Sequence, residues 1–578
     1  MAGPAVNVVG KPLNKSVRQA ATSMMQADQR HRSKLRIAVI LDRIDVPAWQ
    51  AATLLRLVRS DYAQIVLAVL SCGDPADAQV ELEPRPRAEN ALERLAARPL
   101  LGLLRVLEAK IECKHDPFAS ADGGALLADT EILRGEAAAL ARGAAGERKL
   151  DVVLDLRSTA TTPCADFTAT HGVWRVVQPY TTTDAPATSG FWPVCQGWAV
   201  MEVVLEQRLR DGTRRIVARA FPATHPHSMK LTRANLYWRV ASLLPHKLQQ
   251  LHRSPERFAE TVDRACDAST GALGSPTIAQ LGGHITRNIA RRARASLARR
   301  FENEQWILLY RFGEELSLQP ETFTAIVPPA DRFWADPHVV RCEGRYYIFI
   351  EECPFATGKG HISVLALDTD GSYGTPEPVL VRDYHLSYPY IFEHDGTFYM
   401  VPESEANRTV DLYRCVLFPT QWQWVTTLIS DIAATDATVF EHDGRWWMFA
   451  NVVDVEGAAF SEELYLYHSE LLAGPWRPHQ KNPLISDARR ARPGGGVIRR
   501  NGGLYRPAQD CSVRYGFGIR LHEITTLTPS EYAESEVASI MPVWDRRIIA
   551  THTLSYTPGL TVIDALRPRL KLTRAAPQ

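Results

Sequence analysis

The stretch TVFEHDGRWWMF, residues 438–449, consists of two hydrophobic runs on either side of Asp443-Gly444. An Asp-Gly pair accepts the positive φ angles of a tight primed turn, so this stretch predicts a β-hairpin. Three further stretches follow the same pattern: HVVRCEGRYYIF from residue 338, YIFEHDGTFYMV from 390 and GVIRRNGGLYRP from 496. Each has its glycine at the seventh position, so the chain contains a repeat of four hairpins.

The spacing of the repeat predicts a β-propeller. The four glycines are separated by 52, 48 and 58 residues, and a hairpin-bearing period near 50 is typical of propeller blades, which must stack on their neighbours to bury both faces. Residues 304–327 precede the array and 547–566 follow it; pairing them closes the ring with a fifth blade. We therefore expect an all-β five-bladed propeller over residues 304–566. The alternative, a β-sandwich, has turn signals about every 8 to 12 residues and no such period.

Length and composition exclude several classes of protein. At 578 residues the chain is too long for a single core, and its 66 basic and 65 acidic residues leave no net charge to attract nucleic acid. No apolar run is long enough for a membrane span or a signal-peptide core, so we expect a cytoplasmic protein. Nine scattered cysteines without Cys-x-x-Cys spacing predict free thiols and no metal site.

The first half of the chain follows a different pattern. After a lead of residues 1–33, expected to be disordered, apolar runs predict strands at 35–42, 63–71, 150–157 and 172–178, with a helix between the first two. Strand, helix and strand at this spacing indicate a parallel βαβ unit. Residues 34–255 are therefore predicted to form a Rossmann-like α/β domain, although the Gly-x-Gly-x-x-Gly fingerprint of dinucleotide binding is absent after the first strand.

Four segments of this half, GVWRVVQPYT, SGFWPV, LRDGTRRIVARAF and NLYWRVASLLPHKLQQL, resemble the formyltransferase-like domain of bacterial polysaccharide-locus proteins. The resemblance implies a catalytic Asn, His and Asp. Asp211, which precedes a glycine, matches the Asp, but Gln178 stands where the His is expected and cannot shuttle a proton. We expect a degenerate domain with Gln178 and Asp211 as remnants of the site and no folate cofactor; active formyl transfer is the alternative.

Residues 256–303 are predicted to form a basic helical linker, ending in HITRNIARRARASLARRF. A basic amphipathic helix can lie on anionic lipid, so peripheral membrane contact through residues 287–300 is one interpretation. A solvated linker helix is the other. Residues 567–578 are expected to form a C-terminal tail.

Candidate site residues come from the geometry of a propeller, in which the first strand of each blade lines the central channel. Two positions before the repeats stand Asp336, Tyr388, Asp436 and Gly494, so two carboxylates occupy equivalent places. With Glu403 at the end of a second strand, Asp336 and Asp436 are the candidate catalytic residues. The candidate substrate-binding residues are Trp334, Tyr388, Glu352, Arg492, Arg506, Gln509 and Asp510. The two aromatic rings are expected to stack on a sugar, and the arginines to bind an anionic sugar or phosphate or to neutralise the channel carboxylates.

The array also resembles known families through the motifs WADPHVV, HLSYPYIFEHDG, VPESEANRTVDLYR, ATDATVFEHDGRWWMF, ARPGGG, LYRPAQDCSVRYG and ATHTLS. These motifs are similar to five-bladed propellers of glycoside hydrolase family 43 and, more closely, to the N-terminal propeller of plant glucosamine inositolphosphorylceramide transferases and their bacterial relatives. The first resemblance implies Asp336 as the general base, but no glutamate stands in the Glu-Gly-Pro context of the family's acid.

The resemblance implies a carbohydrate-active protein. We expect a sugar-modifying or glycosyl transferase that makes a surface polysaccharide or glycolipid, with a glycan, nucleotide-sugar or glycolipid substrate in the propeller channel and no nucleic-acid partner. A family 43-like glycoside hydrolase and a non-catalytic glycan-binding scaffold are the alternatives.

Overall fold

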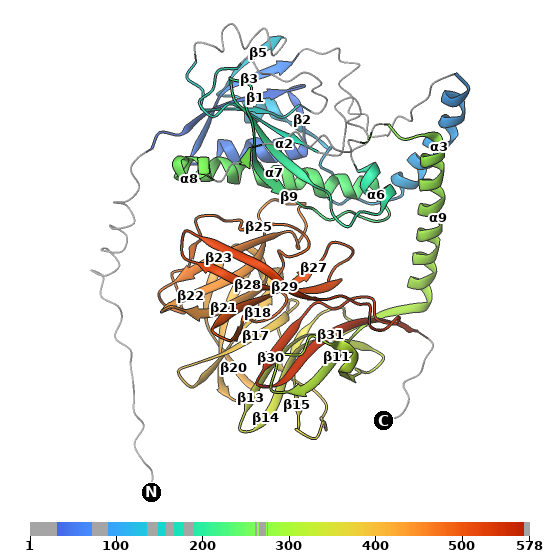
Figure 1. Ribbon diagram of the computed structural model, residues 1–578, viewed down its shortest axis with the longest axis vertical. Coiled ribbons are helices and arrows are strands. Elements are labelled where there is room, and N and C mark those ends of the chain that lie inside the picture. Colours follow the sequence, from blue (N-terminus) through green and yellow to red (C-terminus); the bar gives the residue numbers. More distant parts are fainter. Residues whose placement is uncertain are drawn as a thin grey trace.

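The computed structural model describes residues 32–71, 91–135, 148–157, 167–178, 190–260, 263–264, 273 and 275–571. An N-terminal part, built on one mixed sheet, lies on one end of a β-propeller, and helix α9 (Ile278–Phe301) runs down the side between them (Figure 1). The predicted disordered lead lies outside the described residues except for Arg32 and Ser33.

The N-terminal sheet has eight strands in the order β10-β9-β8-β7-β6-β1-β3-β5. Their bounds are β1 Leu35–Leu41, β3 Ala63–Ser71, β5 Glu131–Gly135, β6 Val152–Asp155, β7 Val173–Val177, β8 Val203–Arg208, β9 Arg214–Ala220 and β10 Asp263–Arg264. The five strands from β5 to β7 are parallel, and β8, β9 and β10 are added antiparallel at one edge. A separate pair joins β2 (Asp45–Pro47) to β4 (Ser120–Asp122). The four strands expected in this half are present as β1, β3, β6 and β7.

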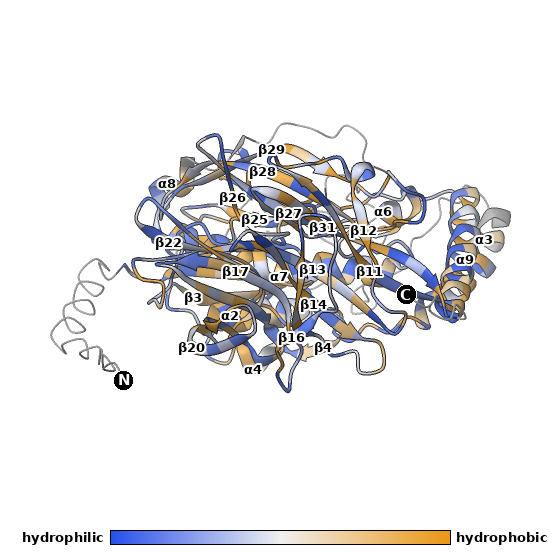
Figure 2. Cartoon of the chain, turned by 90° about the horizontal axis from the view of Figure 1, so that it is seen from below, coloured by the Kyte–Doolittle hydropathy of each residue, from blue (hydrophilic) through white to orange (hydrophobic). Residues whose placement is uncertain are grey.

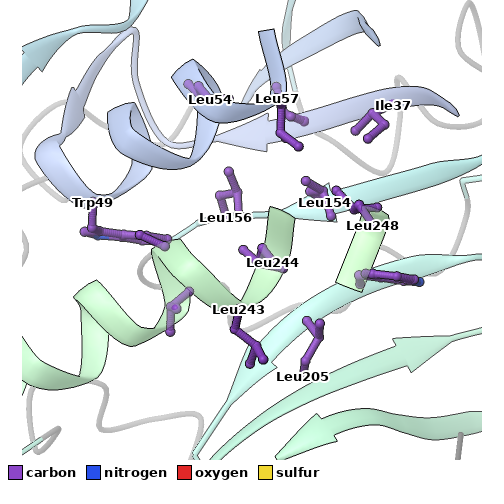
Figure 3. Close-up of a cluster of buried hydrophobic side chains, with 14 of the residues drawn as sticks. Ile37, Trp49, Leu54, Leu57, Leu154, Leu156, Leu205, Leu243, Leu244 and Leu248 are labelled. Atoms are coloured by element: carbon purple, nitrogen blue, oxygen red, sulfur yellow. The ribbon is translucent and has the colours of Figure 1, made fainter. Parts of the chain in front are cut away.

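Helices α2 (Ala48–Val58) and α7 (Met229–Arg253) pack on this sheet. The other helices of the N-terminal part are α3 Ala91–Ala109, α4 Gly123–Leu126, α6 Phe191–Gln196 and α8 Pro255–Glu260. The main core lies between the sheet and helices α2 and α7, where Ile37, Leu154 and Leu205 of the strands meet Leu54, Leu57 and Leu244 of the helices (Figure 3). Burial of these aliphatic side chains is the main stabilising contribution of the N-terminal part, about 1.5–3 kcal/mol for each.

The propeller has five blades, as the repeat predicts. Blade one contains β13 Arg332–Cys342, β14 Arg345–Pro354, β15 His361–Leu367 and β16 Glu377–Leu380; blade two contains β17 Ser387–His394, β18 Thr397–Ser404, β19 Thr409–Leu417 and β20 Gln421–Ser430. Blade three contains β21 Ala433–His442, β22 Arg445–Val453, β23 Glu463–Ser469, β24 Arg477–Pro478 and β25 Ile485–Ser486. Blade four contains β26 Ile498–Arg500, β27 Gly503–Asp510, β28 Gly518–Leu527 and β29 Tyr532–Ile540; blade five contains β12 Thr324–Ile326, β11 Glu302–Gly313, β31 Gly559–Leu570 and β30 Leu554–Thr557. Two single turns of 3₁₀ helix occur at Pro320–Thr322 and Glu405–Asn407.

The ring closes where the two ends of the array pair. Strand β11 is antiparallel to β31 over its whole length, from Glu302 opposite Leu570 to Gly313 opposite Gly559. These strands extend slightly beyond the predicted limits of 304–566 at both ends, so the first residues of the expected tail belong to the sheet. Closure leaves no open edge between the first and last blades.

The four hairpin turns have the predicted geometry. The turn residues Glu343, Asp395, Asp443 and Asn501 have φ of 49°, 49°, 51° and 50°, and each following glycine also has a positive φ. Two successive positive φ angles define the type I′ turn, whose twist matches that of the strands.

Helix α9 is the basic helix expected within residues 256–303. Thr277 caps its N-terminus with a capping box to Gln280, and its buried residues pack beside α3 and α6 with Leu104 and Phe191. Among the helices that the structure describes, none is both long and apolar enough to cross a membrane.

Helix α7 connects the two parts of the molecule. Arg239 lies between Glu462 and Glu463 of blade three, with Nη2 2.9 Å from Glu462 Oε2 and Nη1 2.5 Å from Glu463 Oε1. His246 Nε2 lies 2.8 Å from Asp454 Oδ2. The loop between β22 and β23, which we call the 454–462 loop, is therefore held at both ends by the N-terminal part.

Candidate functional site

The first strands of blades one, two and three, which are β13, β17 and β21, each contain a bulge at the same position. We call the opening of the central channel beside these bulges the mouth. The pairings of β13, β17 and β21 with their neighbours each shift register at this place, and Asp336, Tyr388 and Asp436 there have φ of 51°, 41° and 54°. A left-handed backbone costs a non-glycine residue about 1–3 kcal/mol, and a bulge re-aims its side chain. The equivalence expected from the sequence is therefore present in the backbone.

Asp336 is buried at the centre of this arrangement, with 4% of its surface exposed. Its Oδ1 accepts a hydrogen bond from Thr553 Oγ1 at 2.8 Å and lies 3.3 Å from Nε2 of His552. Its Oδ2 accepts a hydrogen bond from the backbone N–H of Tyr388 at 3.3 Å. Burial raises the pKa of Asp336 to about 7; the cationic His552 opposes the shift and neighbouring carboxylates add to it.

His552 is held between two aspartates. Its ring stacks on Trp306 with centroids 4.1 Å apart, and its Nδ1 lies 2.6 Å from Asp564 Oδ2. Burial alone would lower the pKa of His552, but Asp564 and Asp336 outweigh it and raise the pKa to about 9. The ligand atoms of these three side chains lie close enough for a metal ion. With the imidazole protonated, its charge balances those of the two carboxylates.

Asp436 and Glu403 share one arginine. Arg492 donates from Nε to Asp436 Oδ2 at 2.6 Å and from Nη2 to Asp436 Oδ1 at 3.2 Å, and the same Nη2 donates to Glu403 Oε2 at 3.3 Å. Gln509 Nε2 donates to Asp436 Oδ2 at 2.7 Å. The bidentate arginine and the amide fix the orientation of the Asp436 carboxylate.

Glu403 differs from its neighbours in its charge environment. Burial and the nearby Asp436 raise the pKa of Glu403 well above its ordinary value, although Arg492 opposes the shift. About 14% of its side chain is still accessible. The mouth therefore contains an accessible carboxyl group that favours its protonated form beside another, Asp336, that titrates near neutral pH.

An exposed aromatic ring, that of Tyr515, lies at this mouth, and the backbone of a second exposed aromatic residue, Phe460, contacts the shared arginine. The guanidinium of Arg492 lies over the ring of Tyr515, 5.0 Å from its centroid, and its Nη1 donates to the carbonyl of Phe460 at 2.9 Å. Tyr515 is 47% exposed and Phe460 43% exposed. An aromatic ring that is held by neighbouring side chains but is open to solvent, as that of Tyr515 is, suits stacking on the apolar face of a sugar.

The two rings that the sequence suggested for stacking are instead buried. Trp334 is 5% exposed, belongs to the core between blades one and five, and donates from Nε1 to Glu352 at 3.4 Å. Tyr388 is 3% exposed; its hydroxyl bonds Thr438 Oγ1 at 2.8 Å and accepts from the N–H of Gly495 at 3.0 Å. Both rings therefore stabilise the propeller, and neither is open to a ligand.

Three predicted binding residues lie in ion-pair networks away from the shared arginine. Glu352 pairs with Arg332 at 2.8 Å and accepts from Ser363 at 2.7 Å. Burial would raise its pKa, but hydrogen bonds from His361, Arg332 and Ser363 lower the pKa to about 2. Arg506 pairs with Glu534 at 2.8 Å, and Asp510 with Arg520 at 2.7 Å. Glu351, the neighbour of Glu352, faces the channel instead, where its charge acts on Asp336.

The two remnants expected in the N-terminal part are not brought together. Gln178 follows β7 at the end where Val177 is opposite Val204, whereas Asp211 lies beyond the other end, where Val173 is opposite Arg208. At about 3.3 Å per residue, the strand pair separates them by about 13 Å or more. Asp211 is an exposed turn residue that accepts from the N–H of Thr213 at 2.8 Å, and these turn hydrogen bonds lower its pKa.

The propeller matches a known family over much of its length. The family model is described as "Glucosamine inositolphosphorylceramide transferase 1, N-terminal". It matches residues 323–548. The chain is 35% identical over 208 residues to glucosamine inositolphosphorylceramide transferase 1 of Oryza sativa subsp. japonica, and 33% identical over 208 residues to that of Arabidopsis thaliana. The resemblance to plant glucosamine inositolphosphorylceramide transferases that the propeller motifs indicate is thus confirmed for this segment.

Each match covers only part of either protein. The aligned segment is 36% of this chain and 28% of the rice protein or 27% of the Arabidopsis protein. Among solved structures, the GH43_1 enzyme from Xanthomonas citri is similar at 14% identity and a TM-score of 0.31, over 41% of this chain and 87% of that one. CoXyl43, a GH43 β-xylosidase/α-arabinofuranosidase from a compost metagenome, aligns at 14% identity and a TM-score of 0.32, over 45% and 94%.

Sequence reasoning missed His552, Asp564 and Tyr515. His552 and Thr553 lie in the motif ATHTLS, and Tyr515 in LYRPAQDCSVRYG. The predicted closure of the ring could have indicated His552 and Asp564, because closure brings the segment after the fourth hairpin back to the first blade. Polar residues of that segment are then candidates for contact with Asp336.

Proposed function

We propose that the protein is a carbohydrate-active transferase whose propeller channel binds a sugar conjugate during the synthesis of a glycolipid or surface polysaccharide. The observation that carries the proposal is the position of Asp336, Glu403, Asp436 and Arg492 at one mouth, within the segment that matches the transferase family model. The chain spans less than a third of the length of those relatives.

The difference in charge environment between Glu403 and Asp336 supports a different role for each in this proposal. Glu403, whose pKa is raised, is the general acid that gives its proton to the leaving-group oxygen as the bond to the sugar breaks. Asp336, with a pKa of about 7, is the base that takes the proton of the attacking hydroxyl as the new bond forms. Arg492 and Gln509 hold Asp436 beside them, and Tyr515 with Phe460 supplies the platform for the sugar ring.

The test compares Asp336→Asn and Glu403→Gln with wild type. Both changes keep the size of the side chain but remove the titrating group, so transfer should fall by about 10² or more while glycan binding is retained. The assay is a glycan array, followed by incubation of the bound glycans with nucleotide-sugar donors and mass analysis. Glu352→Gln is the matched control. It also removes a buried carboxylate of the propeller, but Glu352 pairs with Arg332 outside the mouth.

Other outcomes separate the alternatives. Release of free sugar without an acceptor indicates a hydrolase. Unaltered glycan in wild type, together with weaker binding in both variants, indicates a non-catalytic scaffold.

For the N-terminal part we propose a Rossmann-like α/β domain over residues 34–255, related to formyltransferases but without their activity, joined by a 256–303 linker to the propeller. The run of five parallel strands supports the first half of this proposal, and the separation of Gln178 from Asp211 supports the second. Purified protein should not transfer formyl groups from 10-formyltetrahydrofolate to amino sugars; turnover that disappears in Asp211→Ala would contradict this. A cytoplasmic location remains a prediction from the sequence.

A further inference from the structure

Helix α9 has an apolar face that is open to solvent. Ile289, Ala293, Leu297 and Phe301 recur at intervals of four residues and so lie on one side of the helix. Ile289 is 42% exposed, Leu297 61% and Phe301 46%, and Ala293 is exposed as well. We call these four residues the α9 stripe. The opposite, packed side of the same helix buries Leu281, His284, Ile285 and Asn288. The α9 stripe is therefore a second apolar surface, and this one faces solvent.

Exposed arginines lie on the same helix as the α9 stripe, and Arg294 and Arg300 are nearest to it in helical angle. The helix contains six arginines and no acidic residue. Arg292 is used internally, since it lies 3.2 Å from Glu108 and donates to the carbonyl of His227 at 2.6 Å. Arg291, Arg294, Arg299 and Arg300 are exposed. The nearest acidic residues in sequence, Glu302 and Glu304, lie beyond the helix in β11, and Glu304 pairs with Arg514.

The position of α9 leaves this face accessible. The helix forms one margin of the molecule in Figure 1, with α3 beside its upper half, and it lies at the margin again in the perpendicular view of Figure 2. Apart from α3, the N-terminal part and the propeller lie on its inner side in both views. Helix α3 adds two more exposed apolar residues, Leu103 at 41% and Val106 at 53%.

We propose that the α9 stripe and its flanking arginines dock on an anionic lipid surface. An exposed apolar stripe beside cationic side chains is the composition of helices that lie in the membrane interface. A nucleic acid would match the arginines but leave the stripe without a partner. A second copy of this helix would match the stripe but place arginines of like charge together. Anionic lipid satisfies both features. This docking does not depend on the proposed function, although it would bring the channel close to a lipid-linked substrate.

The test is sedimentation of the full-length protein with vesicles. Wild type should bind phosphatidylserine-containing phosphatidylcholine vesicles, should not bind pure phosphatidylcholine vesicles, and should bind less as salt is raised. The triple variant Ile289→Ser, Leu297→Ser, Phe301→Ser should weaken binding at least tenfold. Arg294→Gln with Arg300→Gln should weaken it by about fivefold per arginine.

A matched control tests whether loss of exposed apolar surface elsewhere affects vesicle binding. Val416→Ser with Leu417→Ser removes side chains of similar exposure, 53% and 57%, from β19 of blade two, and should leave vesicle binding unchanged. Failure of wild type to bind anionic vesicles, or equal binding by the triple variant, would overturn the proposal. A dimer in analytical ultracentrifugation that the triple variant abolishes, or a duplex-DNA mobility shift without vesicle binding, would overturn it in favour of a second copy or a nucleic acid.

Discussion

Arg239 and Glu462 lie 223 positions apart in the sequence, yet Nη2 of one is 2.9 Å from Oε2 of the other and both side chains are about 1% exposed. Glu462 also accepts a hydrogen bond from the N–H of Ala223 at 2.9 Å. The 454–462 loop that ends at this glutamate presents the Phe460 carbonyl to Arg492. The first half of the chain therefore supports the loop beside the channel mouth, which gives a physical reason for its attachment to the propeller.

Replacing Arg239 should destabilise the protein strongly. Arg239→Ala leaves the carboxylates of Glu462 and Glu463 buried without their cation, and breaking a buried ion pair in this way costs about 3–5 kcal/mol. Urea unfolding followed by tryptophan fluorescence measures the change. Arg408→Ala is the control, because its pair with Asp431 is exposed and should contribute at most about 1 kcal/mol. Equal losses in the two variants would show that the buried pair has no special role.

Removing the last strands should open the propeller. Deletion of residues 547–578 removes β30 and β31. Strand β11 then loses the neighbour with which it pairs along its whole length. The deletion also removes the fully buried Leu560, Val562 and Ile563. The truncated protein should lose the cooperative unfolding transition of the propeller, whereas deletion of 572–578 alone, which leaves β31 complete, should not. An unchanged melting curve for the longer deletion would contradict the closed ring.

Local and global features of the propeller were predictable to different degrees. The hairpins followed from single Xaa-Gly pairs, because a type I′ turn depends on only two residues. The fivefold ring followed from their spacing. The carboxylates of Asp336 and Asp436 could be placed because equivalent positions in a repeat face the same channel.

The aromatic residues of the site were not predictable by the same reasoning. Strict alternation puts Trp334 and Asp336 on one side of the strand. The positive φ of Asp336 breaks that alternation, and Trp334 packs into the core instead. Tyr515 lies in the irregular segment between β27 and β28, where no periodicity indicates direction.

Tyr515 should be needed for glycan binding. Tyr515→Ala removes an exposed ring at the mouth, so array signals should fall by about tenfold, while Tyr515→Phe keeps the stacking face and should bind almost as wild type does. Trp424→Ala, which removes a ring of similar exposure from β20, is the control. Undiminished glycan binding by Tyr515→Ala would remove the ring from the site.

Because of His552, the free energy of unfolding of the propeller should decrease as the pH rises above neutrality. The folded pKa of His552, about 9, lies above the ordinary value of 6.5, so the folded state binds the proton more tightly than the unfolded chain does. The stabilisation is complete below pH 6.5 and is lost as the pH rises through 9. The charges that face the ring are those of Asp564, Asp336 and, more distantly, Asp436.

The measurement is the melting temperature at a series of pH values for wild type and His552→Gln. Wild type should lose stability between pH 6.5 and 9, and the loss should be smaller in His552→Gln because the variant has no proton to release there. His394→Gln, at the end of a hairpin strand, controls for removal of an imidazole outside the channel and should follow wild type. Parallel curves for wild type and His552→Gln would show that the imidazole is not held as a cation between its two aspartates.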